Sequence, residues 1–246
     1  MAPLTRPVTR PLTFSIRKKV FPAVGLRGEM IVLKDIAFHV QPGSFVVITG
    51  PSGSGKSTML NIIAGLDQAY EGDIDLGGGD KCLAYVFQSP RLLPWRTVYE
   101  NIALVLPAGD RRRGNIPDLL KRVGLSDAAS AYPEMISLGM QRRVALARAF
   151  VLEPEVLLMD EPFVSLDDPT AQDLRELLVE LWSSRPTTVL FVTHDRAEAV
   201  MLSTRILRLS GAPASIVGDI PVSLSVADRT DRDKVRAEQR RIFGDA

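Results

Sequence analysis

The sequence has a single cysteine and no long apolar run, and these two shortages exclude several classes of protein. Cys82 has no partner for an internal disulfide, so it is expected to serve as a small buried hydrophobe. Because about 18 consecutive apolar residues occur nowhere, the chain is not expected to cross a bilayer by itself. The composition is typical of a reducing cytoplasm.

The chain also lacks a large charge of either sign. Its formal net charge is +1, so no overall field attracts nucleic acid or anionic lipid, and no nucleic-acid partner is predicted. The run Arg111–Arg113 is expected to be a solvated loop, with a specific anion site as the alternative. Residues 1–19 are basic and contain prolines but no apolar stretch of a secretory signal, which predicts a flexible arm leading into a strand.

Apolar runs and helical patterns alternate along the chain, which predicts an α/β fold with a mainly parallel sheet covered by helices. Between residues 89 and 149, prolines interrupt short helical patterns at 98–106 and 117–123, so an inserted helical lobe is expected there. Residues 227–242 are expected to form a polar, solvated surface helix, with a regulatory or partner-binding element as the alternative. The expected strands are residues 13–16, 31–33, 36–40, 45–49, 83–87, 156–159 and 188–193.

Residues 50–58 read GPSGSGKST, a complete phosphate loop between the apolar run 45–49 and a helical pattern that starts at Thr58. Backbone N–H groups at the start of such a helix are available to bind phosphate. Glycine lets the backbone turn tightly around the anion, lysine supplies a compact positive charge, and the serine hydroxyl suits Mg²⁺. The nucleotide-binding residues predicted from this loop are Gly50, Pro51, Ser52, Gly53, Ser54, Gly55, Lys56, Ser57 and Thr58, with Ser57 also as a metal ligand.

A second element follows the apolar run Val156–Met159, where two acids, Asp160 and Glu161, end an expected strand. The carboxyl ends of strands form the edge at which open α/β sheets bind ligands, so Asp160 is predicted to hold Mg²⁺ directly or through a water. Glu161 is predicted to orient and polarise the attacking water, as a catalytic residue. Taken alone, two acids at a strand end would be a common solvent-facing arrangement, and it is the phosphate loop that favours the catalytic interpretation.

The order of further motifs makes the chain resemble the ATP-binding cassette (ABC) ATPases over nearly its full length. Residues 85–88 (YVFQ) resemble the Q-loop, 132–149 the signature segment with its helix, 165–167 (SLD) the D-loop, and 191–195 (FVTHD) the switch segment. The resemblance implies a P-loop NTPase core with a mainly parallel sheet, an antiparallel β-subdomain and an inserted helical subdomain. The implied layout is a single nucleotide-binding domain over residues 1–246, with its core at 12–88 and 146–220, the helical subdomain at 89–145 and a tail at 221–246.

The same resemblance assigns roles to residues outside the phosphate loop. It implies that Gln88 reaches the metal and the attacking water, and that His194 contacts the γ-phosphate, both as catalytic residues. Phe21 is the candidate for stacking on adenine, although a core position suits it as well. The signature residues implied to contact nucleotide bound by a partner chain are Ser137, Gly139 and Met140.

The segment after the Q-loop, residues 90–101, contains LLPW and resembles the ATPases of nitrate, sulfonate and taurine importers. That resemblance implies ATP as substrate with Mg²⁺, transmembrane permease subunits, and through them a periplasmic binding protein. It also implies a head-to-tail dimer with itself or a related ATPase, in the cytoplasm on the inner face of the cell membrane. Exposed Leu92, Leu93 and Trp95 would form the surface that receives the permease, while a core position is the alternative for Trp95.

One departure from the family pattern bears on catalysis, because the segment reads Ile136-Ser137-Leu138-Gly139-Met140 where the family usually has LSGGQ or LSGGM. If the backbone at Leu138 needs a positive φ, strain of about 1–2 kcal/mol would slow assembly of the site roughly tenfold. If φ is negative, the change is nearly silent. The functions left open are an importer ATPase, an ATP-binding regulatory module with low hydrolysis, and the weaker partner in a pair of unequal subunits.

Overall fold

The structure, a computed structural model, describes residues 10–22, 28–79, 81–185 and 187–244. It divides into two compact units. The first unit is built from the two ends of the chain, up to Lys81 and from Thr188 onward, and the second unit is built from Cys82–Thr187. The predicted layout, with its boundaries at residues 88, 145 and 220, stays a prediction.

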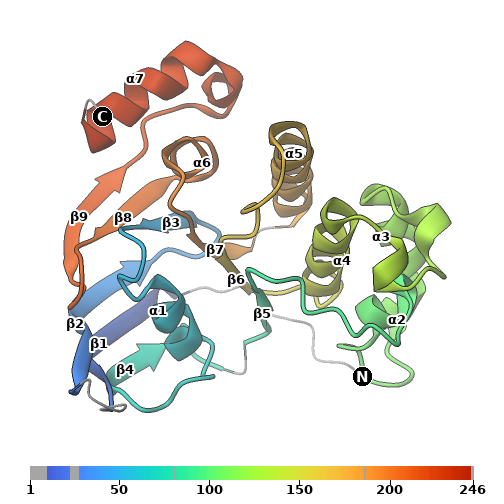
Figure 1. Cartoon of the computed structure of the whole chain (residues 1–246), viewed down its shortest axis with the longest axis horizontal. Coiled ribbons are helices and arrows are strands. Elements are labelled where there is room, and N and C mark those ends of the chain that lie inside the picture. The colour runs from blue at the N-terminus through green and yellow to red at the C-terminus, as the bar shows by residue number, and fades with distance from the viewer. Residues whose placement is uncertain (1–9, 23–27, 80, 186, 245–246) are drawn as a thin grey trace. The chain divides into compact units, whose positions relative to one another are not determined.

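The first unit contains an antiparallel sheet in the order β2-β1-β4 (Figure 1). Alternate residues of β1 are buried, and Phe14 stacks on Phe38 of β2 with 4.7 Å between the ring centroids. From Leu12 onward the expected flexible arm is therefore a strand, and residues 1–9 lie outside the described part. The two strands expected at 31–33 and 36–40 are one, joined through Asp35 with φ of 52°. The strands of this sheet are β1 (Leu12–Phe21), β2 (Met30–Val40) and β4 (Glu71–Asp75).

Four more strands of the first unit lie in the order β7-β3-β8-β9. β3 is parallel to both β7 and β8, and β9 is antiparallel to β8. Every residue of β3 and β7 is buried, as expected for continuous apolar runs covered on both faces. The bounds are β3 (Phe45–Thr49), β7 (Thr188–Val192), β8 (Arg205–Leu209) and β9 (Ile216–Pro221), and helix α1 (Lys56–Ile63) follows β3.

Strands β4, β8 and β9 were not predicted. Each carries charged or polar residues within a short length, as in the β4 sequence EGDID, so apolar periodicity alone does not mark it.

The second unit combines two parallel strands with helices, which confirms the expected helical insertion in the α/β fold. Prolines and polar turns shorten the helices of this lobe, and α2 begins with a capping box made by Thr97 and Glu100. Helix α4 packs against both α2 and α5. The elements are β5 (Leu83–Val86), β6 (Val156–Asp160), α2 (Val98–Ala103), α3 (Ile116–Arg122), α4 (Leu138–Phe150) and α5 (Asp168–Ser184), with short 3-10 helices at Arg111–Asn115, Ser126–Ala128 and Pro133–Met135.

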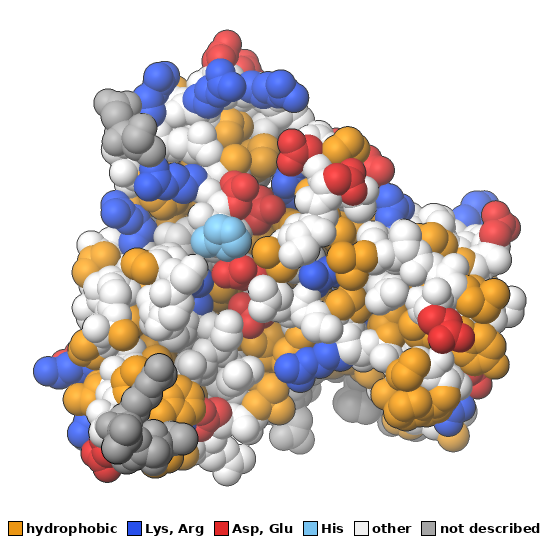
Figure 2. Space-filling model, viewed as in Figure 1, with side chains coloured by type: hydrophobic (Ala, Val, Ile, Leu, Met, Phe, Trp, Pro, Cys, Tyr) orange, Lys and Arg blue, Asp and Glu red, His pale blue; other side chains and the backbone are white. Residues whose placement is uncertain are grey.

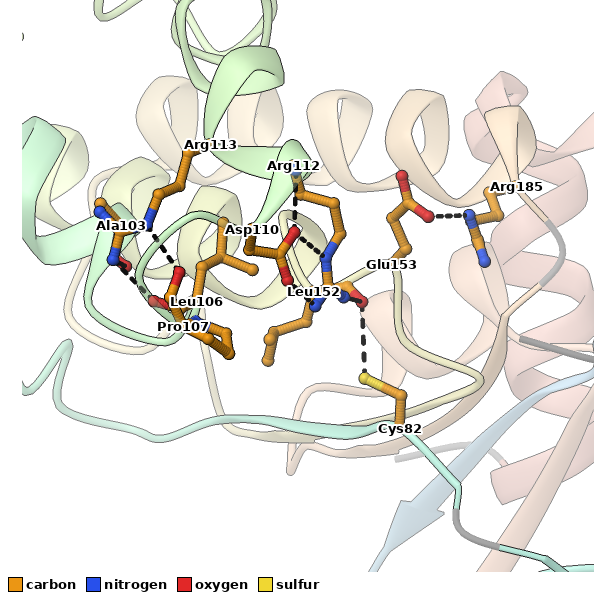
Figure 3. A network of polar contacts seen from close by, with 10 residues as sticks. All are labelled: Cys82, Ala103, Leu106, Pro107, Asp110, Arg112, Arg113, Leu152, Glu153 and Arg185. Atoms are coloured by element: carbon orange, nitrogen blue, oxygen red, sulfur yellow. Dashed lines mark hydrogen bonds and ion pairs between the residues drawn. The ribbon is translucent and has the colours of Figure 1, made fainter. Parts of the chain in front are cut away.

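The expectation of a solvated loop at Arg111–Arg113 is wrong for two of its three residues (Figure 3). Arg112 pairs with Asp110 at 2.6 Å, which lowers the pKa of that carboxyl to about 2, and donates to the Leu152 carbonyl at 2.7 Å. Arg113 donates to the carbonyls of the chain that leaves α2, at Ala103, Leu106 and Pro107. Both side chains therefore stabilise the lobe by donating hydrogen bonds to backbone carbonyls.

Cys82 lies in the same network and is half-buried. Its Sγ donates to the Leu152 carbonyl at 3.5 Å, and burial raises the pKa of the thiol. Cys82 was expected to be a small buried hydrophobe, and it is instead half-buried with a polar contact to a backbone carbonyl.

The expectation of a solvated C-terminal helix without a buried face is also wrong. Helix α7 (Arg232–Phe243) packs against α6 (Arg196–Leu202) in the first unit (Figure 1). Val235, Glu238 and Ile242 form a buried stripe at helical spacing, in which Glu238 accepts from the Ser223 backbone N–H at 2.6 Å and from Arg241. A glutamate in the middle of the stripe conceals it from a hydrophobicity count.

Replacing Ile242 by alanine is expected to lower the free energy of unfolding by about 2–5 kcal/mol, because a buried side chain is truncated and a cavity remains. The matched control is Arg236→Ala on the exposed face of the same helix, which is expected to change it by about 0.5 kcal/mol or less. Urea denaturation measures both, and equal midpoints for the two variants would contradict the packing of α7.

Candidate functional site

The phosphate loop of the first unit lies where the sequence placed it, between the end of β3 and the start of α1. Gly55 precedes the helix without a side-chain cap, so no side chain occupies the first amide groups of α1. The Lys56 ammonium donates to the carbonyls of Gly50 and Pro51 at 2.9 and 2.8 Å, and its side chain therefore lies across the loop. Helix α1 begins two residues before the expected Thr58, at Lys56.

Two glycines allow the loop's conformation for different reasons. Gly53 has φ of 75° and open space where a Cβ would lie. Gly55 has φ of 89°, and an added Cβ would lie 2.7 Å from a Val32 methyl carbon and 2.8 Å from a Leu33 methyl carbon. A residue with a side chain would be strained at either position, but only Gly55 is also enclosed.

The residues of the loop fit a bound phosphate. Ser54 Oγ is buried and has no hydrogen-bond partner in the part of the chain that the structure describes. The Ser57 side chain is exposed on the first turn of α1, and Ser52 is exposed as well. A buried hydroxyl without an acceptor, an uncapped helix N-terminus and a lysine on the loop together supply the donors that an anion requires.

His194 lies at the same edge of the sheet as the phosphate loop. Ile48 pairs with Val192 in the parallel register of β3 and β7, so the loop and His194 leave neighbouring strands two residues beyond that pair. The turn after β7 is fixed because Thr193 Oγ1 donates to Glu198 at 2.6 Å and accepts from the Asp195 N–H at 3.0 Å. Asp195 also caps α6. The imidazole is therefore exposed on a rigid turn.

The second unit repeats this arrangement with Gln88 and the two acids. Val86 pairs with Met159 in the parallel register of β5 and β6, so Gln88 and Asp160 both follow that pair at one edge. The Asp160 side chain is buried, whereas Gln88 is exposed. Glu161 has φ of 43°, an uncommon conformation that turns the chain sharply directly after the strand. Burial, and then the charge of Asp160, raise the pKa of Tyr85 within β5.

The signature segment forms the start of α4. The Ser137 hydroxyl caps this helix by accepting from the Met140 N–H at 3.2 Å. Leu138 is the first helical residue and is not among the residues with positive φ, so the strain considered for this position is absent. Gly139 is enclosed, because a Cβ there would lie 2.6 Å from a Thr170 methyl carbon. The leucine is therefore conformationally silent, and its side chain is 41% exposed.

The D-loop segment follows in the same unit. Ser165 has φ of 64°, and Asp167 caps α5 by accepting from the Thr170 N–H at 3.2 Å. Hydrogen bonds from Thr170 lower the pKa of the Asp167 carboxyl. These contacts fix the chain between the strand end at Asp160 and α5.

Sequence reasoning missed the side chains that hold the Q-loop. Arg142 donates to the Gln88 carbonyl and Arg148 to the carbonyls of Pro90 and Arg91, and both arginines lie on α4. The only signal in the sequence was the recurrence of arginine along an otherwise buried helix.

Phe21 and Trp95 are both outside the core. Phe21 ends β1 with 38% of its surface exposed, and the Lys19 ammonium lies 4.8 Å from its ring centroid. Trp95 is 69% exposed on a loop that Asn101 fixes by accepting from the Leu93 N–H and donating to three carbonyls of residues 93–97. The core alternatives for both aromatic residues are therefore wrong, whereas the role of Phe21 at adenine stays a prediction.

Further exposed apolar side chains accompany Trp95 in the second unit. Leu104, Tyr132 and Met135 are exposed, while Leu92 and Leu93 are half-buried. Figure 2 shows hydrophobic side chains gathered over the part of this unit that holds α2 and α3.

No helix among the described residues has the length and apolar character required to span a membrane. The described residues also contain no group of three or more histidine, cysteine, aspartate or glutamate side chains placed to hold a metal ion.

Comparison with known proteins gives consistent matches. A family model described as ABC transporter matches residues 33–164. The aliphatic sulfonates import ATP-binding protein SsuB of Bacillus subtilis (strain 168) is 38% identical over 95% of this chain and 93% of its own length. SsuB 1 of Pseudomonas savastanoi pv. phaseolicola (strain 1448A / Race 6) is 45% identical over 84% of this chain and 85% of its own.

Solved structures of MJ0796 are similar as well. The dimeric structure of this bacterial ABC transporter cassette is 30% identical, with a TM-score of 0.74 over 87% of this chain and all of the other. A post-hydrolysis state of the same ATP-binding cassette, bound to ADP and Pi, gives a TM-score of 0.73 at the same identity and coverage.

Replacing Gly55 by alanine is expected to cost at least twice the free energy of unfolding lost by Gly53→Ala. Both variants carry left-handed strain of about 1–2 kcal/mol, but only the first forces a Cβ onto Val32 and Leu33. Urea denaturation measures the two losses, and ATP titration is expected to show weaker binding for both. Equal losses of stability would contradict the enclosure of Gly55.

Proposed function

Because this chain belongs to the ABC transporter family and is an ATP-binding cassette ATPase, we propose that it powers the import of aliphatic sulfonates or similar small solutes. The observation that carries the proposal is the match to SsuB of Bacillus subtilis, which extends over 95% of this chain. The LLPW segment at residues 92–95 agrees with the same importer group.

Within the first unit, the phosphate loop is proposed to bind the β- and γ-phosphates through its backbone N–H groups and Lys56. His194, on the adjacent strand end, is proposed to donate a hydrogen bond to the γ-phosphate. Phe21 is proposed to stack on the adenine, since its ring is exposed and any flat aromatic face suffices.

Within the second unit, Glu161 is proposed to orient and polarise the attacking water, and Gln88 to contact that water. Mg²⁺, when bound, would neutralise charge on the phosphates. Gln88 and Asp160 of this unit are each proposed as a ligand, and so, separately, is Ser57 of the first unit. This set offers a hydroxyl, an amide and a carboxylate oxygen, which are the hard ligands that Mg²⁺ prefers. The small number of carboxylates agrees with a metal held largely by substrate oxygens and water.

The proposed assembly is a head-to-tail dimer with permease subunits on the inner face of the cell membrane. Ser137, Gly139 and Met140 are proposed to contact nucleotide on the partner chain, since the N-terminus of α4, which Ser137 caps, favours an anion through the helix dipole. The exposed Trp95 loop is proposed to receive the permease, and a periplasmic binding protein is proposed to deliver the solute.

The function is tested with the chain reconstituted with its permease subunits and binding protein in lipid vesicles. ATP is expected to drive uptake of a labelled alkanesulfonate, and Glu161→Gln is expected to lower hydrolysis and uptake by about 100-fold or more while ATP still binds. Glu176→Gln, which changes an exposed glutamate on α5, is the matched control and is expected to change neither rate. Uptake of another solute class in place of sulfonates would overturn the substrate assignment.

The alternative function, a regulatory module with low hydrolysis, depended on a strained Leu138. Because Leu138 begins α4 without a positive φ, glycine at this position would relieve no strain. Leu138→Gly is therefore expected to leave the turnover number within about threefold of the parent. A steady-state ATPase assay measures this, and a large gain in turnover would favour the regulatory module.

A further inference from the structure

A buried arginine of α4 connects two loops of the second unit. Arg142 is five residues beyond Ser137 and only 4% exposed. One terminal nitrogen donates to the Gln88 carbonyl, and the other donates to the Val164 carbonyl at 3.3 Å. The helix that begins with the signature segment thus bonds to the chain at the end of β5 and to the chain just before the D-loop.

This side chain has no ion pair with any carboxylate in the described part of the chain, and its Nε has no hydrogen-bond partner there. Burial lowers the pKa of the guanidinium accordingly. A buried charge that is met only by neutral carbonyls is costly. The planar guanidinium offers several donors in fixed directions, so it can hold two separate backbone segments at once.

A second arginine holds the same loop at a further point. Arg148 donates to the Pro90 carbonyl at 2.6 Å and to the Arg91 carbonyl at 2.9 Å. The loop is also stiffened from within, because the Arg91 guanidinium lies 3.7 Å from the Phe87 ring centroid and that ring stacks on Tyr85. The backbone from Gln88 to Arg91 is therefore bound to α4 at both ends.

We propose that Arg142 is a positioning residue for ATP hydrolysis, which fixes Gln88 and the start of the D-loop to the helix that carries Ser137. The consequence is that these three segments keep one geometry relative to one another. The inference rests on the proposed role of Gln88, through which Arg142 acts on the reaction. Arg142 itself touches neither nucleotide nor water.

The test is a double-mutant cycle on the full-length chain, with steady-state ATPase assays. Arg142→Met is expected to lower kcat about tenfold with KM for ATP changed less than about twofold, because the phosphate loop belongs to the other unit. In a Gln88→Ala background the same change is expected to lower kcat less than about threefold, since the residue being positioned is already gone. Arg142→Lys, which keeps one charged donor, is expected to restore part of the loss.

The matched control is the neighbouring Arg143→Met. Arg143 lies on the same helix but donates to the Val123 carbonyl at 3.1 Å and lies 3.6 Å from Asp173, away from both loops. Arg143→Met removes this hydrogen bond and ion pair, so it is expected to lower the melting temperature with kcat unchanged. Where Arg142→Met does not fold, Arg142→Gln serves in its place.

The outcomes separate two kinds of failure. An equal loss of kcat from Arg142→Met in both backgrounds, or an equal loss from Arg143→Met, overturns the inference. If Gln88→Ala alone leaves kcat unchanged, the proposed role of Gln88 fails, and Arg142 has no residue to act through.

Discussion

Parallel pairing of neighbouring strands is the constraint on which both halves of the machinery depend. Hydrogen bonds between β3 and β7 set Ile48 opposite Val192, and those between β5 and β6 set Val86 opposite Met159. Each register brings the chain that follows each strand to one edge, beyond Thr49 and Val192 in the first pair and beyond Val86 and Asp160 in the second. A slip of one residue in either pair would turn a chemically active side chain into the opposite face.

The strand ends alone do not fix the positions of these side chains, because a chain leaving a sheet is ordinarily mobile. Side-chain caps supply the missing rigidity in this protein. Thr193 and Asp195 brace the turn that carries His194, and Asp167 closes the D-loop against α5. Glu161 and Ser165 adopt left-handed conformations within that braced stretch, which its surroundings must therefore stabilise.

The continuous apolar strands and the ordered motifs could be predicted from the sequence, since both are local patterns. β3 was predicted with its exact bounds, and the phosphate loop lies where its residues placed it. Strands β4, β8 and β9 could not be predicted, because their short, partly charged sequences lack the apolar pattern of a strand. The same holds for Arg142 and Arg112, whose acceptors are backbone carbonyls that carry no mark in the sequence.

At Leu138, comparison with the family motif suggested a problem that the structure does not have. A motif with glycine at this position does not show whether glycine is needed there for a positive φ or only for its small size. The start of α4 answers that for this chain, because an ordinary helical residue fits there. At Gly139, by contrast, a larger residue would clash with the adjacent Thr170 methyl group.

The loop that carries Trp95 is already ordered before any partner arrives, because the fully buried Asn101 amide bonds to backbone groups of Leu93, Arg96 and Thr97. A large aromatic ring presented in this way loses little conformational entropy when another surface covers it. Immobilising a flexible side chain on binding costs roughly 0.5–1.5 kcal/mol, and a pre-organised contact avoids much of that cost. A modest contact area around this tryptophan can therefore contribute more binding free energy than the same area on a flexible loop.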